Sequence, residues 1–125
     1  MKKIIISASL LAIASLALGG CVTTPSRFEW GAYESSLYNY AKKPEKRQAY
    51  KEALEQAIAK GQATHRVAPG LNAELGYLHL EDGDTNGAVS CFEEEIRLFP
   101  ESKPFLSKVI ARAKGQPEQT SGAAS

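Results

Sequence analysis

The sequence predicts a small all-α bundle of about five helices. Between residues 27 and 114, apolar residues recur three and four positions apart, which is the spacing of one helix face. Prolines, glycines and aspartates separate these apolar segments. No segment alternates apolar and polar residues for long enough to form a strand. Because the whole chain has 125 residues, this region is expected to form a single domain.

Two helices are predicted between residues 30 and 61. The first has large apolar residues at helical spacing, although Gly31 is unfavourable in its first turn; they are Trp30, Tyr33, Leu37 and Tyr40. Pro44 opens the second helix, because proline suits a first turn, and Gly61 is expected to end it. The second helix has the clearest apolar face in the chain, which consists of Tyr50, Ala53, Leu54, Ala57 and Ile58.

A third and a fourth helix are expected after Pro69-Gly70. The third ends before Asp82-Gly83-Asp84, and its inward residues are Leu71, Leu75 and Leu78. The fourth runs from about Thr85 to Leu98 and is closed by Pro100. Its inward residues are Ala88, Val89, Phe92 and Ile96.

The fifth helix begins near Pro104, with Ser102 as a candidate N-cap. Its apolar stripe consists of Phe105, Leu106, Val109, Ile110 and Ala113. Short isolated helices are marginal in water, so the second and fifth helices are expected to pack on either side of the third and fourth. Residues 115–125 are rich in Gly, Pro, Ser, Thr and Gln and are predicted to be a disordered tail.

The third and fourth helices resemble one tetratricopeptide repeat. The positions that match it are Leu75, Gly76, Ala88, Phe92 and the terminating Pro100. A small residue on each helix lets an antiparallel pair approach closely, and an aromatic ring fills the space beyond it. Two positions depart from the repeat, because His79 stands where tyrosine is usual and Glu95 where a small residue is usual. The alternative is a plain helical hairpin whose residues match by chance.

The first 20 residues have the plan of a cleaved signal peptide. A short basic start precedes an apolar run that is too short to span a bilayer. The run ends in Leu18-Gly19-Gly20-Cys21, which resembles the lipobox of bacterial lipoproteins. That resemblance implies cleavage before Cys21, acylation of its thiol and a membrane anchor of two or three acyl chains. An ordinary secretory signal with a chance cysteine, or a single buried helix, is the alternative.

Residues 21–26 then form the lipidated cysteine and a short polar tether before the helical domain at residues 27–114. Val22 follows the cysteine. In Gram-negative lipoproteins, an Asp after the cysteine resembles a signal for retention in the inner membrane. This chain has no Asp there, so the lipoprotein resemblance implies sorting to the outer membrane, on its periplasmic face.

Four segments between Phe28 and about Val109 form a recognisable set: Trp30-Gly31-x-Tyr33, Pro69-Gly70-Leu71-x-Ala73-Glu74-Leu75-Gly76, Gly83-Asp84 and Phe99-Pro100-Glu101-Ser102. With these segments, the region resembles a family of small bacterial lipoproteins known as domain of unknown function 4810. Lipoproteins of this kind are often encoded beside a lipoprotein related to the curli secretion pore and another small lipoprotein. The resemblance therefore implies a shared envelope assembly and no enzymatic activity.

Charge and motif content exclude several function classes. Removal of the first 20 residues takes away Lys2 and Lys3, which leaves 13 basic and 14 acidic residues, so no excess positive charge is present to bind nucleic acid. The sequence has no metal-binding, phosphate-binding or nucleophile motif, and it indicates no cofactor and no small-molecule substrate. The run Glu93-Glu94-Glu95 is expected to be solvated, and Cys91 is expected to be a buried thiol.

The aromatic residues near the start of the domain have two possible uses. Phe28, Trp30, Tyr33, Tyr38 and Tyr40 either pack against the second helix or form a patch for a partner or for lipid headgroups. Packing is the favoured use, and the candidate partner surface consists of Trp30, Tyr33 and His79.

The function expected from the sequence is that of a non-enzymatic adaptor whose helical groove holds another envelope protein. One alternative is a structural lipoprotein that supports the outer membrane or the cell wall. Another is an enzyme that uses His79 with Glu74 or Glu81, although no local motif favours it.

Overall fold

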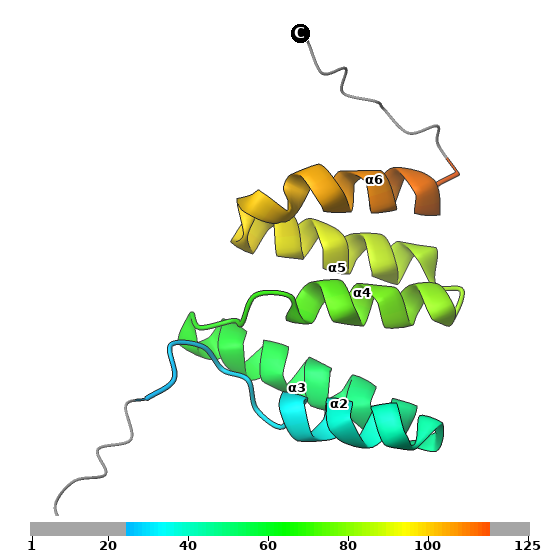
Figure 1. Ribbon diagram of the computed structural model, residues 1–125. Helices are drawn as coiled ribbons and strands as arrows, with labels where there is room; N and C mark the ends of the chain where they lie inside the picture. The colour runs from blue at the N-terminus through cyan, green and yellow to red at the C-terminus, as the bar shows by residue number, and fades with distance from the viewer. Residues whose placement is uncertain (1–24, 116–125) are drawn as a thin grey trace, which may run out of the picture.

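The computed structural model describes residues 25–115, which form a stack of five α-helices (Figure 1). The helices are α2 (Tyr33–Lys42), α3 (Arg47–Thr64), α4 (Leu71–Glu81), α5 (Thr85–Leu98) and α6 (Lys103–Ala113). Short 3-10 turns, η1 (Pro44–Lys46) and η2 (Pro100–Ser102), lead into α3 and α6. The predicted all-α class is confirmed, since the described residues hold no strand beyond one isolated β-bridge between Glu29 and Val67. The predicted signal peptide, Cys21 and nearly all of the tail lie outside the described residues.

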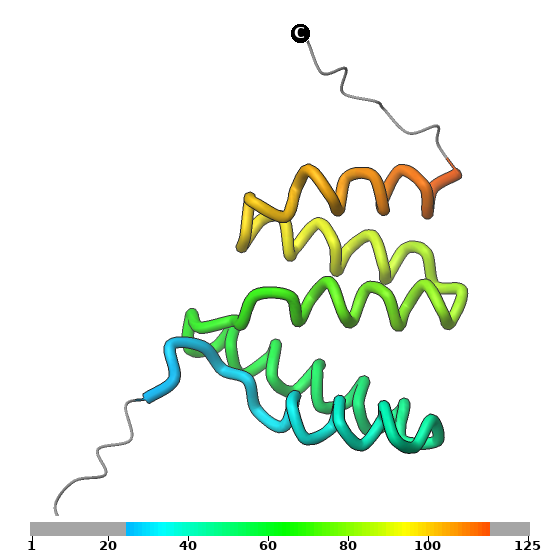
Figure 2. The backbone as a smooth tube through the Cα atoms, in the orientation of Figure 1, coloured from blue at the N-terminus to red at the C-terminus, as the bar shows by residue number. Residues whose placement is uncertain are grey.

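Each helix packs mainly on its neighbours in chain order, so the stack grows in one direction from α2 to α6 (Figure 2). The larger core cluster joins α3 to α4 and the α3–α4 loop; its buried members are Tyr50, Leu54, Ala57, Ile58, Ala68, Leu71, Leu75 and Leu78. The smaller cluster joins α5 to α6 and consists of Ala88, Phe92 and Leu106. The helical pair α4–α5 therefore lies between two apolar layers, as its sequence pattern predicts.

The α4–α5 pair packs closely because Gly76 has no side chain. A Cβ at Gly76 would lie 2.6 Å from Cε1 of the Phe92 ring, far inside normal contact distance. Phe92 and Ala88 on α5 are both fully buried. The Phe92 ring therefore lies directly against the backbone of α4, which only glycine permits. Pro100 is exposed and opens η2, two residues after α5 ends at Leu98.

A buried carboxylate joins α5 to the start of α4. The side chain of Glu95 is 3% exposed, and its Oε1 accepts a hydrogen bond of 2.6 Å from the backbone N–H of Gly70, the N-cap of α4. Its Oε2 has no partner among the described residues, and neither has Nδ2 of the buried Asn72. Burial raises the pKa of Glu95, and backbone N–H groups of Gly70, Ala73 and Asn72 oppose that rise. The expectation that Glu95 is solvated was wrong.

Two other sequence expectations were also wrong. Gly61 does not end the second helix, because α3 continues to Thr64 and His65 follows it in the left-handed conformation. Gly61 is instead buried within α3, where a Cβ would lie 2.7 Å from the backbone Cα of Val67. Phe105, expected in the apolar stripe of the last helix, is 63% exposed, and Leu106 alone is fully buried there.

The segment before α2 is held against the end of α3. The backbone N–H of Glu29 donates to the carbonyl of Arg66 over 2.8 Å, and the Glu29 carboxylate pairs with Lys60 and Arg66. The Arg66 side chain in turn donates to the carbonyl of Ser26. The N-terminal end of the domain is therefore attached to the loop between α3 and α4.

Replacing Gly76 by alanine tests the close α4–α5 contact. We expect Gly76→Ala to lower the free energy of unfolding by about 1–3 kcal/mol, because the new methyl group overlaps the Phe92 ring. At an uncrowded helical position the same change would stabilise by about 0.5–1 kcal/mol. Urea unfolding followed by circular dichroism gives the difference. Phe92→Leu should partly relieve the overlap, so the double variant should lose less than the two single losses together. Strict additivity would contradict the proposed contact.

The Glu95 carboxyl should make stability depend on pH. Its pKa is raised on folding, so the folded chain binds the proton more tightly than the unfolded chain, and stability falls as pH rises above the ordinary value of 4.5. We therefore compare the free energy of unfolding of the native protein with that of Glu95→Gln. We expect the native value to fall relative to the variant as pH rises above 4.5, until Glu95 is ionised in the folded protein. Denaturant unfolding at a series of pH values measures this. Parallel pH profiles would show that burial of Glu95 does not affect its titration.

Candidate partner-binding surface

Helix α4 approaches both of the helices that lie two places away from it in the chain. The hydroxyl of Tyr33 on α2 reaches Glu74 on α4, with an O–O distance of 3.2 Å. A groove is lined by residues of α4 and α6, with none from α5.

The groove between α4 and α6 is small and mainly apolar. It has a volume of about 270 Å³, and its lining residues are Tyr77, Leu80, Phe105, Val109, Arg112 and Ala113. Leu80 and Val109 are partly buried against the α5–α6 core. Tyr77 is 39% exposed and Phe105 63% exposed, so two aromatic rings stand beside this apolar floor. The Tyr77 ring packs edge to face on Phe92 with centroids 5.2 Å apart, and this contact with the core positions Tyr77 at the groove.

The α6 side of the groove is basic. Between Lys103 and Ala113 the helix holds Lys103, Lys108 and Arg112 and no acidic residue. Lys108 is exposed and follows Phe105 by three residues, so both lie on neighbouring parts of one helix face. Neither Lys103 nor Lys108 forms an ion pair with another described residue. Positive charge therefore borders the two exposed rings.

A second hollow lies between the N-terminal segment, the end of α3 and the end of α5. Its volume is about 580 Å³, and polar and apolar residues line it: Phe28, Gly61, Gln62, His65, Val67, Glu94, Arg97, Leu98 and Phe99. The Phe28 and Phe99 rings meet across it with centroids 6.4 Å apart. Arg97 is engaged by Glu94 through two hydrogen bonds of 2.6 and 2.7 Å. The lining of this hollow is more polar than that of the α4–α6 groove.

Trp30 and Tyr33, two of the predicted partner residues, pack together against the core of α3 and α4. Their ring centroids are 5.7 Å apart, and Tyr33 also contacts Tyr50. Glu74 accepts from both tyrosine hydroxyls, with 2.5 Å to that of Tyr50. Burial, together with the neighbouring Glu74 carboxylate, raises the pKa of both tyrosines. The two phenols therefore stay protonated, and this cluster holds α2, α3 and α4 together.

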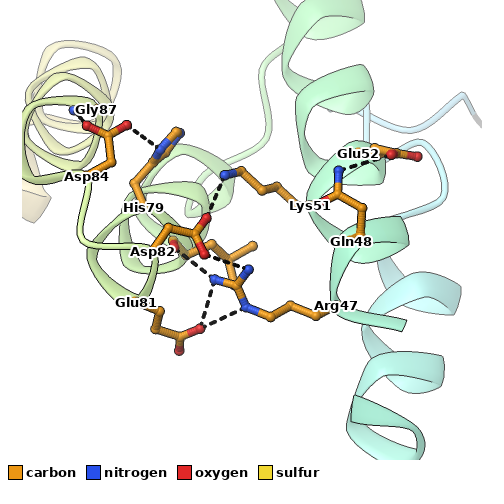
Figure 3. A network of polar contacts seen from close by, with 10 residues as sticks. Arg47, Gln48, Lys51, Glu52, His79, Glu81, Asp82, Asp84 and Gly87 are labelled. Atoms are coloured by element: carbon orange, nitrogen blue, oxygen red, sulfur yellow. Dashed lines mark hydrogen bonds and ion pairs between the residues drawn. The ribbon is translucent and has the colours of Figure 1, made fainter. Parts of the chain in front are cut away.

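His79, the third predicted partner residue, belongs to a different cluster at the α4–α5 turn (Figure 3). Its Nδ1 lies 2.9 Å from Asp84, which caps α5 by accepting from the backbone N–H of Gly87. That backbone hydrogen bond, with His79 nearby, lowers the pKa of Asp84. The structure does not bring His79 together with Trp30 and Tyr33.

The same turn is bound to the start of α3 by ion pairs, also drawn in Figure 3. Arg47 pairs with Glu81 and Asp82 at 3.1 and 2.9 Å, and Lys51 pairs with Asp82 at 2.8 Å. The hydrogen bond from Lys51 is the main cause of a lowered pKa at Asp82. Glu81 thus pairs with Arg47, and the carboxylate beside His79 is that of Asp84.

The described residues show no arrangement for metal chemistry. They contain no group of three His, Cys, Asp or Glu side chains able to hold a metal ion. Cys91 is partly buried against the α3–α4 core, and burial raises its thiol pKa. None of the helices between residues 25 and 115 is both long and apolar enough to cross a bilayer.

Sequence reasoning did not select Tyr77 or Phe105, although both line the groove. The order of the predicted helices was the available signal. In a stack where each helix packs on the next, helices that lie two places apart in the chain come close to each other, and Tyr77 and Phe105 lie on such a pair.

Comparison with known proteins gives one match. No curated protein and no solved structure matches the chain significantly. A family model described as Domain of unknown function (DUF4810) matches residues 28–109, which include α2 to α5 and the first part of α6. The chain therefore belongs to the DUF4810 family.

Proposed function

We propose that this protein is a lipid-anchored, non-enzymatic adaptor in an assembly of the bacterial cell envelope. The observation that carries the proposal is the apolar groove between α4 and α6, where Tyr77 and Phe105 are both exposed. Exposed aromatic rings at a groove are typical of surfaces that bind another protein.

The arrangement of α4 and α5 supports a tetratricopeptide-like module. Gly76 and Ala88 allow the two helices to approach, and Phe92 fills the space between them. Solenoids of this type bind peptides on the face made by alternate helices. The flanking helices α3 and α6 cover the two sides of the pair, so one repeat is enough for a compact domain.

The anchor is proposed from the sequence before the domain. The lipobox-like Leu18-Gly19-Gly20-Cys21 supports acylation of Cys21, and Val22 supports sorting to the periplasmic face of the outer membrane. Only a few residues separate Cys21 from Ser26, whose carbonyl binds Arg66. An acylated chain would therefore hold the domain close to the bilayer. A lipoprotein related to the curli secretion pore is the proposed partner class.

Replacing the anchoring cysteine tests location. We expect the native protein to sediment with membranes and Cys21→Ser to appear in the soluble fraction or as an uncleaved precursor, because serine cannot form the thioether. Cell fractionation and mass spectrometry of the N-terminal peptide give the result, and Cys91→Ser is the matched control. An unmodified residue 21 in native protein that washes off membranes would refute the anchor.

Mild chemical crosslinking in intact envelopes tests the adaptor role. We expect purification after detergent extraction to recover a specific envelope protein in constant proportion, and Cys21→Ser to lose most of it. Recovery of the protein alone under the same conditions would contradict an adaptor. A deletion strain that leaks periplasmic contents, with no pathway affected specifically, would instead favour a structural envelope protein.

A further inference from the structure

We propose that the α4–α6 groove binds an acidic amphipathic segment of the partner. This inference rests on the adaptor function proposed above and adds the site and the chemistry of the bound segment. Its basis is the combination of an apolar floor, two exposed rings and a rim with positive charge.

The groove has room for side chains of a peptide. Its volume of about 270 Å³ suits one or two large apolar side chains. These anchors would rest on Leu80 and Val109, with Tyr77 and Phe105 on either side. An amphipathic helix presents such anchors three or four residues apart.

The charge at the groove selects an acidic segment. Lys108 is exposed and unpaired among the described residues, and Arg112 lines the groove itself. The acidic residues of α4 are engaged elsewhere: Glu74 accepts from two tyrosine hydroxyls, and Glu81 is paired with Arg47. Carboxylates beside the apolar anchors would meet the basic rim, whereas lysines there would be repelled.

A second copy of this chain is a poorer occupant. α6 carries Lys103, Lys108 and Arg112 and no acidic residue, so two copies that met through this helix would place like charges against each other. The groove therefore suits a different chain.

Site-specific photocrosslinking in membranes of the full-length protein tests the inference. Benzoylphenylalanine replaces Phe105 in one strain and Tyr38 in another; Tyr38 is 60% exposed and lies on α2, outside the groove. We expect an adduct only from position 105, and we expect the sequenced partner peptide to be net negative with apolar residues three or four apart. An adduct to this same chain, or to a basic or uniformly polar segment, would overturn the inference.

Reversing the charge of Lys108 tests whether the basic residues beside the groove contribute to binding. With the crosslinker at position 105, Lys108→Glu should reduce adduct formation by about fivefold, as expected for one attraction replaced by one repulsion. Lys46→Glu, the same change at an exposed site on η1, should leave the yield unchanged. Equal yields in all three proteins would overturn the electrostatic selection. If chemical crosslinking recovers a partner but position 105 does not, the adaptor stands and the groove is not its site.

Discussion

The contact between Gly76 and the Phe92 ring is the constraint on which the rest of the structure depends. The missing Cβ allows α5 to lie close to α4, and the ring then fills the space between them. Phe92 also packs with Ala88 and with Leu106 of α6, so the same side chain helps to position α6 against α5. The Phe92 ring also packs edge to face with Tyr77, which lines the groove. Packing in the core thus determines where the groove and its aromatic walls lie.

Two carboxylates hold α4 to its neighbours from opposite sides. Glu74 accepts hydrogen bonds from tyrosines of α2 and α3, and Glu95 of α5 accepts from the N-cap of α4. Apolar layers alone would allow neighbouring helices to slide, because dispersion contacts have little direction. Hydrogen bonds to a partly buried carboxylate are directional and costly to leave unmade. These bonds therefore define the register of α4, the helix that contributes residues to both core clusters and to the groove.

The fold was predictable from periodicity because the inward residues of α3, α4 and α5 recur three and four positions apart. Leu71, Leu75 and Leu78 were assigned inward from spacing alone, and all three are buried. The errors came where a single residue has two possible physical uses. Glycine at position 61 was interpreted as a helix end, but here it permits a close approach to Val67. Glu95 belongs to an acidic run, and only the position of the α4 N-terminus shows why it is buried. The groove was not predicted, because finding it requires knowing which helices become neighbours across the stack.

The exposure of Phe105 links the end of the stack to its proposed use. A terminal helix has only one neighbour, so a stripe wide enough to face two helices cannot be fully buried. On α6, Leu106 takes the buried position, while Phe105 and Val109 turn toward the groove beside α4. The Phe105 ring therefore contributes to the groove and not to the core, and Lys108 lies beside it on the same helix. The partner proposed above would cover the part of the terminal stripe that this chain leaves exposed.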